Sequence, residues 1–414
     1  MKTDRAAAAT AGLNPAAPPA IDREVERLAP RLIALRRHLH AHPEPSGQEL
    51  ATTAYLARLL REEGLEVRVA PAGRGLSAEP AATRRGRRVA IRADIDALRL
   101  HDAKDVPYRS LADGVCHACG HDAHTAAAVG AALALEAAAG RAGDAVPWRL
   151  ILQPAEESSE GAREMIEAGA MDGVGAIIAL HVDPERLLGH AAFRTGMLTA
   201  YCDEIDVTVT GSGGHAARPH HAVDPIAAAA ELVSAIYQFV PRAVDSRDPV
   251  VVTFGSIHGG STQNVIPEQV HLRGTARTHS HAATSRVEQR ILEIASGIAG
   301  ATGARIEVEF KRGPDAVVND AAVTDCCRRA AADVLGADNI EDIPAASMGG
   351  EDFADYLAHA PGCLMRLGVG RPDGSTEMLH SPRFDLDESA IGIGARILAR
   401  AAWRLTQPVE ACDS

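Results

Sequence analysis

The chain has few aromatic side chains, fewer basic than acidic residues and no long apolar run. Aromatic residues make up only 3% of its 414 residues, so Ala, Val, Leu and Ile have to fill the core, which is typical of an α/β protein. No run of about eighteen apolar residues occurs, so no segment is expected to span a membrane. The formal net charge of -13 repels polyphosphate, and Lys or Arg nowhere alternates with aromatics, so nucleic acid is not expected as a partner.

The cysteines show no disulfide framework. There are seven, an odd number at irregular spacing, which favours a reducing cytoplasm over secretion. The segment 1–20 is rich in Ala but contains Asp4, Gly12 and several prolines, so it fits a signal peptide poorly. We expect a loose tail at 1–20 and a cytoplasmic protein.

Two patterns of apolar residues divide the rest of the chain, whose length favours two domains. Between 21 and 198, buried strands alternate with helices, which predicts an α/β fold with a mostly parallel sheet and helices on both faces. Between 199 and 311 the strands alternate between apolar and polar residues, which predicts an inserted α+β domain with an antiparallel sheet. The α/β pattern resumes at 312–407, so this segment should rejoin the first domain.

The expected elements follow from these periods. Helices are expected at 21–39, 49–63, 124–139, 225–239, 286–298 and 390–405. Strands are expected at 65–70, 87–94, 148–153, 177–181, 204–210, 250–256, 268–278 and 363–369.

Polar side chains follow the strands of the first domain where each strand ends. In an open parallel sheet, ligands bind beyond the carboxyl ends of the strands. A single histidine at such a place is usually a hydrogen-bonded residue with no role in a site, so a site is indicated only where several polar groups converge. The candidates are Asp94, Asp96, Glu156, Glu157 and His181, with His380 in the loop before the last helix.

The segment 117–124 (HACGHDAH) concentrates residue types that bind metals. Cys119 and His121 are separated by a glycine that permits a tight bend, so a thiolate and an imidazole can reach one cation. The competing interpretation is a loop before a helix, with Asp122 as the helix cap and the histidines in water. The density of such residues favours the metal site for Cys119 and His121. The other residues of this kind fit the second interpretation better: Cys116, His117 and His124.

Glu156 and Glu157 form the second informative pair. Neighbouring side chains of an extended segment point to opposite sides, so one carboxylate can bind a metal while the other faces the substrate. The alternative is a pair of glutamates that keeps a strand end in water. Because the pair stands between an apolar strand and a Ser158-Ser159 loop, we favour the functional interpretation.

Ten segments in order resemble the amidohydrolase branch of the M20 metallopeptidases, which includes hippurate hydrolases and auxin-conjugate hydrolases. The similarity extends from about residue 30 to 405. The matching segments are RRHLH with PE (36–44), IRADIDAL (91–98), HACGHDAHT (117–125), QPAEE (153–157), ALHV (179–182), GGHAARPH (213–220), TQNVIPE (262–268), RGTARTH (273–279), MGGEDFA (348–354) and LHSP (379–382).

This resemblance implies a zinc-peptidase-like catalytic domain (21–198 and 312–407), a lid domain (199–311) and two divalent ions per subunit. The ions would be Mn or Zn, with Ni and Co as further options, because a thiolate favours softer ions but availability decides occupancy. Cys119 would bridge the two ions. The ligands that the resemblance implies are Cys119, His121, Glu157, His181 and His380.

The resemblance also implies roles in catalysis and substrate binding. Glu156 would be the general base, which takes a proton from the attacking water and later gives one to the leaving amine. His215 of the lid would steady the oxyanion, within its own subunit or across a dimer. Asn264 and Arg277 would grip the substrate and its carboxylate; alternatively, Asn264 shapes a turn and Arg277 is an ordinary strand residue.

Three departures from the family pattern stand out. Arg92-Ala93-Asp94 replaces the His-x-Asp of the wider superfamily, and Asp94 is left as a candidate to orient a ligand. Ser158 and Ser159 stand where the family usually has glycines, and His279 replaces a common aromatic. These changes are expected to alter the loop after Glu157 and the acyl pocket.

The predicted function is hydrolysis of small N-acyl amino acids to a carboxylic acid and a free amino acid, with closure of the lid. The alternatives are a dipeptidase or N-carbamoyl-amino-acid hydrolase of the same family, and an inactive metal-binding or assembly protein. Glu156 argues against the last, since a structural metal site needs no base. A homo-oligomer through the lid domain is a further option.

Overall fold

A computed structural model describes residues 17–81, 86–142 and 146–407. The described residues divide into two compact units: unit 1 takes 17–196, 318–344 and 355–407, and unit 2 takes 197–317 and 345–354. Of the tail expected at 1–20, residues 1–16 lie outside the described residues. Residues 17–20 belong to helix α1, which begins at Ala17. Within the described ranges, no helix has the length and apolar character needed to cross a membrane.

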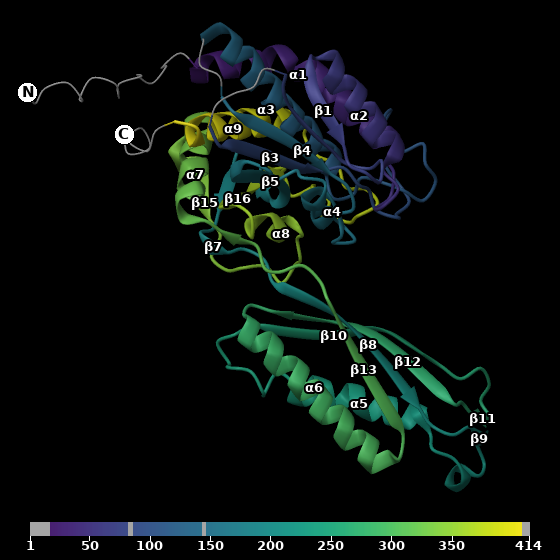
Figure 1. Ribbon diagram of the computed structural model, residues 1–414. Coiled ribbons are helices and arrows are strands. Elements are labelled where there is room, and N and C mark those ends of the chain that lie inside the picture. The colour runs from purple at the N-terminus through teal and green to yellow at the C-terminus, as the bar shows by residue number, and fades with distance from the viewer. Residues whose placement is uncertain (1–16, 82–85, 143–145, 408–414) are drawn as a thin grey trace, which may run out of the picture. The chain divides into compact units, whose positions relative to one another are not determined.

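Unit 1 is built around one sheet, whose strands are β1 (Leu65–Val69), β2 (Leu76–Pro80), β3 (Arg88–Asp94), β4 (Trp148–Gln153), β5 (Val174–Leu187), β6 (Ala191–Phe193), β15 (Ile340–Asp342) and β16 (Gly362–Gly370). Their order is β1-β2-β4-β3-β5-β16-β6-β15 (Figure 1). β3 pairs in parallel with β4 and β5, and β5 pairs in parallel with β16. β3 and β4 are buried along nearly their whole length, because elements of the chain cover both faces of the sheet.

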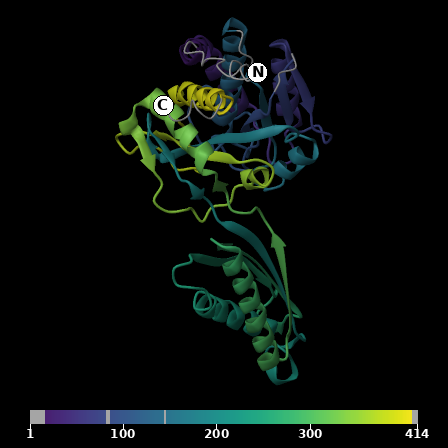
Figure 2. The same ribbon diagram turned by 60° about the vertical axis from the view of Figure 1, so that its left-hand side comes forward.

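The helices of this part of the chain are α1 (Ala17–Ala41), α2 (Leu50–Glu62), α3 (His121–Ala142), α4 (Gly161–Glu167), α7 (Ala321–Leu335), α8 (Phe353–Leu357) and α9 (Ser389–Leu405). α3 joins β3 to β4, and α4 joins β4 to β5. Because the strand order is β4-β3-β5 and such crossovers are right-handed, α3 and α4 lie on opposite faces of the sheet. α1 and α9 pack against α3 and share its apolar core (Figure 2). The predicted fold class is confirmed, although the sequence pattern did not indicate α7.

Unit 2 is a four-stranded antiparallel sheet with two long helices. Its strands are β8 (Tyr201–Thr210), β10 (Val250–Gly259), β12 (Gln269–Thr278) and β13 (Arg305–Arg312), in the order β10-β12-β8-β13. The helices are α5 (Pro225–Phe239) and α6 (His281–Thr302), and a short pair is formed by β9 (Gly214–His215) and β11 (Val265–Ile266). Along β8, Ile205, Val207 and Val209 are buried in the core with residues of both helices, and the residues between them are less buried. This alternation is the one that the sequence predicts for an open-faced sheet.

The register of the central strands brings three segments to one level at the carboxyl edge of the sheet. Asp94 at the end of β3 pairs with Gln153 at the end of β4. Arg92 pairs with Ala179 of β5, so His181, two residues further on, lies level with Asp94. Residues that follow these strand ends therefore meet at one place, although they are far apart in the sequence.

Candidate metal centre

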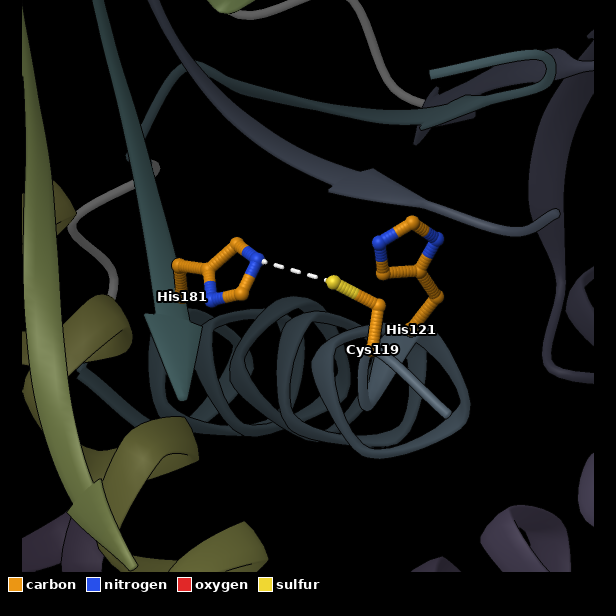
Figure 3. A group of neighbouring side chains, drawn as sticks. All are labelled: Cys119, His121 and His181. Atoms are coloured by element: carbon orange, nitrogen blue, oxygen red, sulfur yellow. Dashed lines mark hydrogen bonds between the residues drawn. The ribbon is translucent and has the colours of Figure 1, made fainter. Parts of the chain in front are cut away.

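Cys119 lies beside two buried histidines at this edge (Figure 3). Its Sγ is 3.5 Å from Nε2 of His181, and Cys119, His121 and His181 each place one ligand atom within 4.8 Å of the other two. We call these three residues the inner triad. Between the first two stands Gly120 at φ 87, where an added Cβ would come within 2.6 Å of Cγ2 of Val182. Only glycine fits this bend.

A second group shares the same cysteine. Cys119, Glu157 and His380 also place one ligand atom each within 4.8 Å of one another, and we call them the outer triad. Oε1 of Glu157 is 3.4 Å from Nε2 of His380. The structure therefore brings all five predicted ligands together, with Cys119 common to both groups.

The donor atoms fit divalent cations. Within 17–81, 86–142 and 146–407, Nε2 of His121 and Oε1 of Glu157 are buried without a hydrogen bond. Such atoms cost free energy unless a partner satisfies them, and a cation is a suitable partner for both. Burial lowers the pKa of His181 well below its usual value, so this imidazole is neutral and can donate its lone pair. Thiolate, imidazole and carboxylate are ligand types that zinc and related ions take.

Asp96 fixes His121 and the backbone of Glu157. Nδ1 of His121 lies 3.0 Å from the carbonyl oxygen of Asp96 and 3.1 Å from its Oδ1. The other carboxylate oxygen accepts hydrogen bonds from Ser46 Oγ at 2.6 Å and from the Glu157 N–H at 3.0 Å. With its Nδ1–H donated to Asp96, His121 keeps Nε2 for a metal. The sequence marked Asp96 only as a strand-end acid and gave no sign of this role.

Asp94 orients His124, which is not one of the predicted ligands. Its Oδ1 accepts a hydrogen bond from Nδ1 of His124 at 2.7 Å, and its Oδ2 accepts one from Arg92 at 2.8 Å, whereas Nδ1 of His121 is 3.9 Å away. Nε2 of His124 accepts the Val182 N–H at 3.0 Å, so this atom is already occupied and is not free to bind a metal. Arg92, which stands where the wider superfamily has a histidine, is a buried hydrogen-bond partner of Asp94 and does not itself serve as a metal ligand.

Two features of the competing interpretation of the segment 117–124, which we preferred for His117 and His124, are wrong. His117 and His124 are buried rather than solvated; His124 lies on α3, which packs inside the main core. Asp122 is the second residue of α3 rather than its cap, and its carboxylate binds Arg36 and His40. Burial lowers the pKa of His117 to about 4, which keeps this imidazole neutral.

Glu156 and Glu157 lie in a turn, not in the extended segment that we expected. The turn follows Ala155, whose φ of 52 is left-handed and whose N–H donates to Oε1 of buried Glu49 at 2.8 Å. Both carboxylates consequently face His121: Oε2 of Glu156 is 3.8 Å and Oε1 of Glu157 is 3.9 Å from its Nε2. A carboxylate therefore stands directly beside the candidate ligands.

A neighbouring cluster of His40, Asp102 and Cys116 has metal-ligand residue types but is filled by an ammonium group. Nζ of Lys104 is 2.9 Å from Oδ1 of Asp102 and 3.4 Å from Sγ of Cys116. Although burial opposes it, Asp122 and Asp102 raise the pKa of His40 to about 10, so this ring carries a proton. Two cations of the protein itself already compensate the acids, which argues against a further metal site here.

The predicted lid residues lie in unit 2. His215 and Asn264 line one pocket of about 550 Å³, because β9 pairs with β11 and the Ala216 N–H donates to the carbonyl oxygen of Asn264 at 3.1 Å. Arg277 on β12 is not among the residues lining this pocket. Its Nη1 donates to the Met348 carbonyl oxygen at 2.9 Å, so it is anchored on the segment 345–354.

The fold and the relatives of the chain indicate a metal-dependent hydrolase of the amidohydrolase and peptidase class. Residues 90–404 match the model of peptidase family M20/M25/M40. The chain therefore belongs to the M20 family, and the resemblance seen in the motifs is confirmed.

Individual relatives and a solved structure support this family assignment. The chain is 40% identical over 382 residues to N-acetyl-L-cysteine deacetylase of Bacillus subtilis, covering 91% of this chain and 89% of that protein. It is 34% identical to thermostable carboxypeptidase 2 of Saccharolobus solfataricus, covering 91% and 95%. A solved structure from Bacillus subtilis, described as a dinuclear metal-binding peptidase of the M20 family, matches with a TM-score of 0.77 and 34% identity over 92% of this chain and 99% of that one. This neighbour supports a centre for two divalent metals.

Proposed function

We propose that the protein hydrolyses the amide bond of small N-acyl amino acids, giving a carboxylic acid and a free amino acid. The observation that carries the proposal is the pair of triads sharing Cys119, with Glu156 beside them. The identity of 40% with an N-acetyl-L-cysteine deacetylase supports this substrate class.

In this proposal the inner triad (Cys119, His121, His181) and the outer triad (Cys119, Glu157, His380) each hold one divalent cation. Two such cations supply Lewis acidity, which polarises the amide carbonyl and makes water a better nucleophile near neutral pH. The thiolate and the three imidazoles favour Zn²⁺, and Mn²⁺ is the main alternative because availability decides occupancy.

Glu156 is proposed to move the protons. Its carboxylate takes a proton from the attacking water and gives it to the leaving nitrogen, so the amine departs as a neutral group. Glu156 is well placed for this proton transfer, because it is largely buried and its Oε2 lies 3.8 Å from Nε2 of His121. Asp96 accepts a hydrogen bond from the Glu157 N–H at 3.0 Å and so keeps the turn of Glu156 and Glu157 in position.

Three residues of unit 2 are proposed to bind the substrate. His215 would donate a hydrogen bond to the developing oxyanion, where such a donor contributes most. Asn264, in the same pocket as His215, would hold the amide group. Arg277 would pair with the substrate carboxylate, a role for which the planar guanidinium is suited.

A panel of substrates tests the proposal. N-acetyl, N-benzoyl and indole-acetyl amino acids, N-carbamoyl amino acids and dipeptides are incubated with the Mn²⁺-loaded and Zn²⁺-loaded protein, and free amino acid, ammonia and carboxylic acid are measured. Release of amino acid and carboxylic acid from N-acyl substrates without ammonia supports the proposal. Ammonia release would assign an N-carbamoyl hydrolase instead.

Peptidase activity is the second candidate, because the chain is also 34% identical to an archaeal carboxypeptidase. Both reactions need the same triads and the same base. Faster cleavage of dipeptides than of any N-acyl amino acid in the panel would favour this candidate.

A further inference from the structure

His380 differs from the other predicted ligands because the fold does not bury it. Its side chain is 55% exposed and its φ is 63. It stands in the segment between β16 and α9, outside any described strand or helix. The contacts that fix this segment against the Cys119 segment therefore decide whether the outer triad forms.

Two backbone hydrogen bonds fix the chain on either side of His380. The His380 N–H donates to the carbonyl oxygen of Ala118 at 2.8 Å. The Ala103 N–H donates to the carbonyl oxygen of Pro382 at 2.9 Å. A neutral hydrogen bond contributes about 1 kcal/mol net, so these two bonds add only modestly to the packing of Phe384, which is buried in the core four residues after His380. Charged contacts lie a few residues further on.

The buried guanidinium of Arg36, on α1, joins the two segments. Its side chain is 1% exposed, and its Nε donates to Oδ2 of Asp122 at 2.8 Å; Asp122 directly follows His121. Its Nη2 donates to Oδ1 of Asp385 at 2.6 Å, and its Nη1 donates to Oε1 of Glu388 at 3.3 Å. One rigid planar group thus binds a carboxylate beside the inner triad and two carboxylates beyond His380.

The surroundings hold this arrangement in one geometry. The Tyr108 hydroxyl donates to Oδ2 of Asp385 at 2.7 Å, and its ring centroid is 4.8 Å from Cζ of Arg36. Nδ1 of His40 lies 2.7 Å from Oδ2 of Asp122. Charge-assisted bonds of this kind are stronger than neutral ones, and removing one partner leaves a buried charge uncompensated. The separation of Asp122 and Asp385 is therefore fixed by Arg36.

Arg37 provides a natural contrast. It is the next residue, but its side chain is 48% exposed, and its Nε donates to Oε1 of Glu388 at 2.9 Å. Across the residues that the structure describes, its hydrogen bonds reach Glu388 and not Asp122. Arg37 thus contacts one of the two segments, whereas Arg36 contacts both.

We propose that Arg36 is a positioning residue for the outer triad: it holds the segment of His380 against the segment of Cys119 and so sets the affinity for the second divalent cation. This inference rests on the proposed function only through its assignment of ligands. The three carboxylates that Arg36 binds are not proposed ligands, so its effect reaches the cation through the spacing of the two segments.

Arg36→Lys tests the proposal because it keeps the charge and removes the planar fork. Metal-free protein is titrated with Mn²⁺ by calorimetry, and with Co²⁺ while the thiolate-to-cobalt charge-transfer band reports on Cys119. We expect the second binding event to weaken about 10- to 100-fold, as for other residues that support metal ligands. The first event should stay within about fivefold, as should both events in the control Arg37→Gln, whose exposed ion pair contributes little.

Equal weakening of both events in Arg36→Lys, or no change in either, would overturn the proposal. If circular dichroism shows that Arg36→Lys does not fold, Asp385→Asn decides, because it keeps the Arg36 pair with Asp122 and weakens the contact of Arg36 with the other segment, which Glu388 then holds alone. Selective loss of the second cation in Asp385→Asn supports the proposal, and any other result contradicts it. If the wild type binds two cations but cleaves no substrate of the panel, the proposed function is wrong and this inference still holds. If the wild type binds only one cation, this inference is wrong.

Discussion

The inner and outer triads share Cys119 but are held by the fold in different ways. The inner triad takes its left-handed bend at Gly120, and its two histidines are buried on α3 and β5. The outer triad depends on turns and loops, and its left-handed positions at Ala155, Ser159 and His380 are not glycines. Such conformations cost free energy and persist only where the surroundings enforce them. We infer that the inner site is preformed, whereas the outer site depends on contacts made elsewhere.

The largest expected effect separates the shared ligand from an unshared one. Cys119→Ala should lose both cations and all activity, whereas His380→Ala should keep about one cation, because only the outer triad loses a ligand. Metal content after dialysis against metal-free buffer measures this difference. Cys116→Ala, which changes a buried cysteine outside both triads, is the control and should keep about two. Retention of two cations by Cys119→Ala would show that the triads do not share this ligand.

The second prediction concerns the base that faces both triads. Glu156→Gln should lower kcat about 10²- to 10⁴-fold, the usual contribution of a general base, while both cations stay bound. Steady-state kinetics and metal content of the same preparation measure the two quantities. Glu160→Gln, at an exposed position four residues further on, should behave as the wild type. Full activity in Glu156→Gln would show that Glu156 is not the residue that transfers the proton.

The sequence predicted the architecture well because the two sheets differ in period. Continuous apolar strands such as β4 and alternating strands such as β8 reflect burial on two faces and on one. The sequence also predicted which polar residues meet at the sheet edge, since the carboxyl ends of parallel strands lie together. These inferences need only local patterns and a general rule of topology.

The contacts that support the site could not be predicted in this way. The turn of Glu156 depends on a hydrogen bond from Ala155 to Glu49, 106 residues away. Likewise, no local pattern shows that Arg36 binds Asp385, 349 residues further along the chain. Such bonds depend on the packed fold, so their partners appear only in three dimensions.

The third prediction compares the protons released by each cation. Burial raises the pKa of the Cys119 thiol, and Asp94 and Asp96, against the effect of burial, raise the pKa of His121 well above its usual value. Both groups must lose a proton to bind a metal, so the first cation should release about two protons at pH 8. For the second cation Cys119 is already a thiolate, and only His380, whose pKa Glu157 raises, can still lose a proton.

Calorimetry in buffers of different ionisation enthalpy counts these protons. The count for the first cation should exceed the count for the second, and lowering the pH should weaken the first binding event more steeply. The control Cys119→Ser should reduce the count for whichever cation still binds. Equal counts for both events would contradict the assignment of Cys119 and His121 to the site that fills first.

The smallest expected effect concerns backbone strain on the outer side. Ser159 has φ 56, a conformation that costs an L-residue about 1–2 kcal/mol and glycine much less. Ser159→Gly should therefore raise the free energy of unfolding of the metal-free protein by up to about 1 kcal/mol in urea, after the larger chain entropy of glycine is counted. Ser158→Gly is the control, because Ser158 is outside the left-handed region. It should lose about 0.5 kcal/mol through chain entropy and up to about 1 kcal/mol more because its hydroxyl donates to the Ala155 carbonyl oxygen. If both variants lose stability equally, the turn of Glu157 stores no strain, and the contrast between the two triads is one of burial alone.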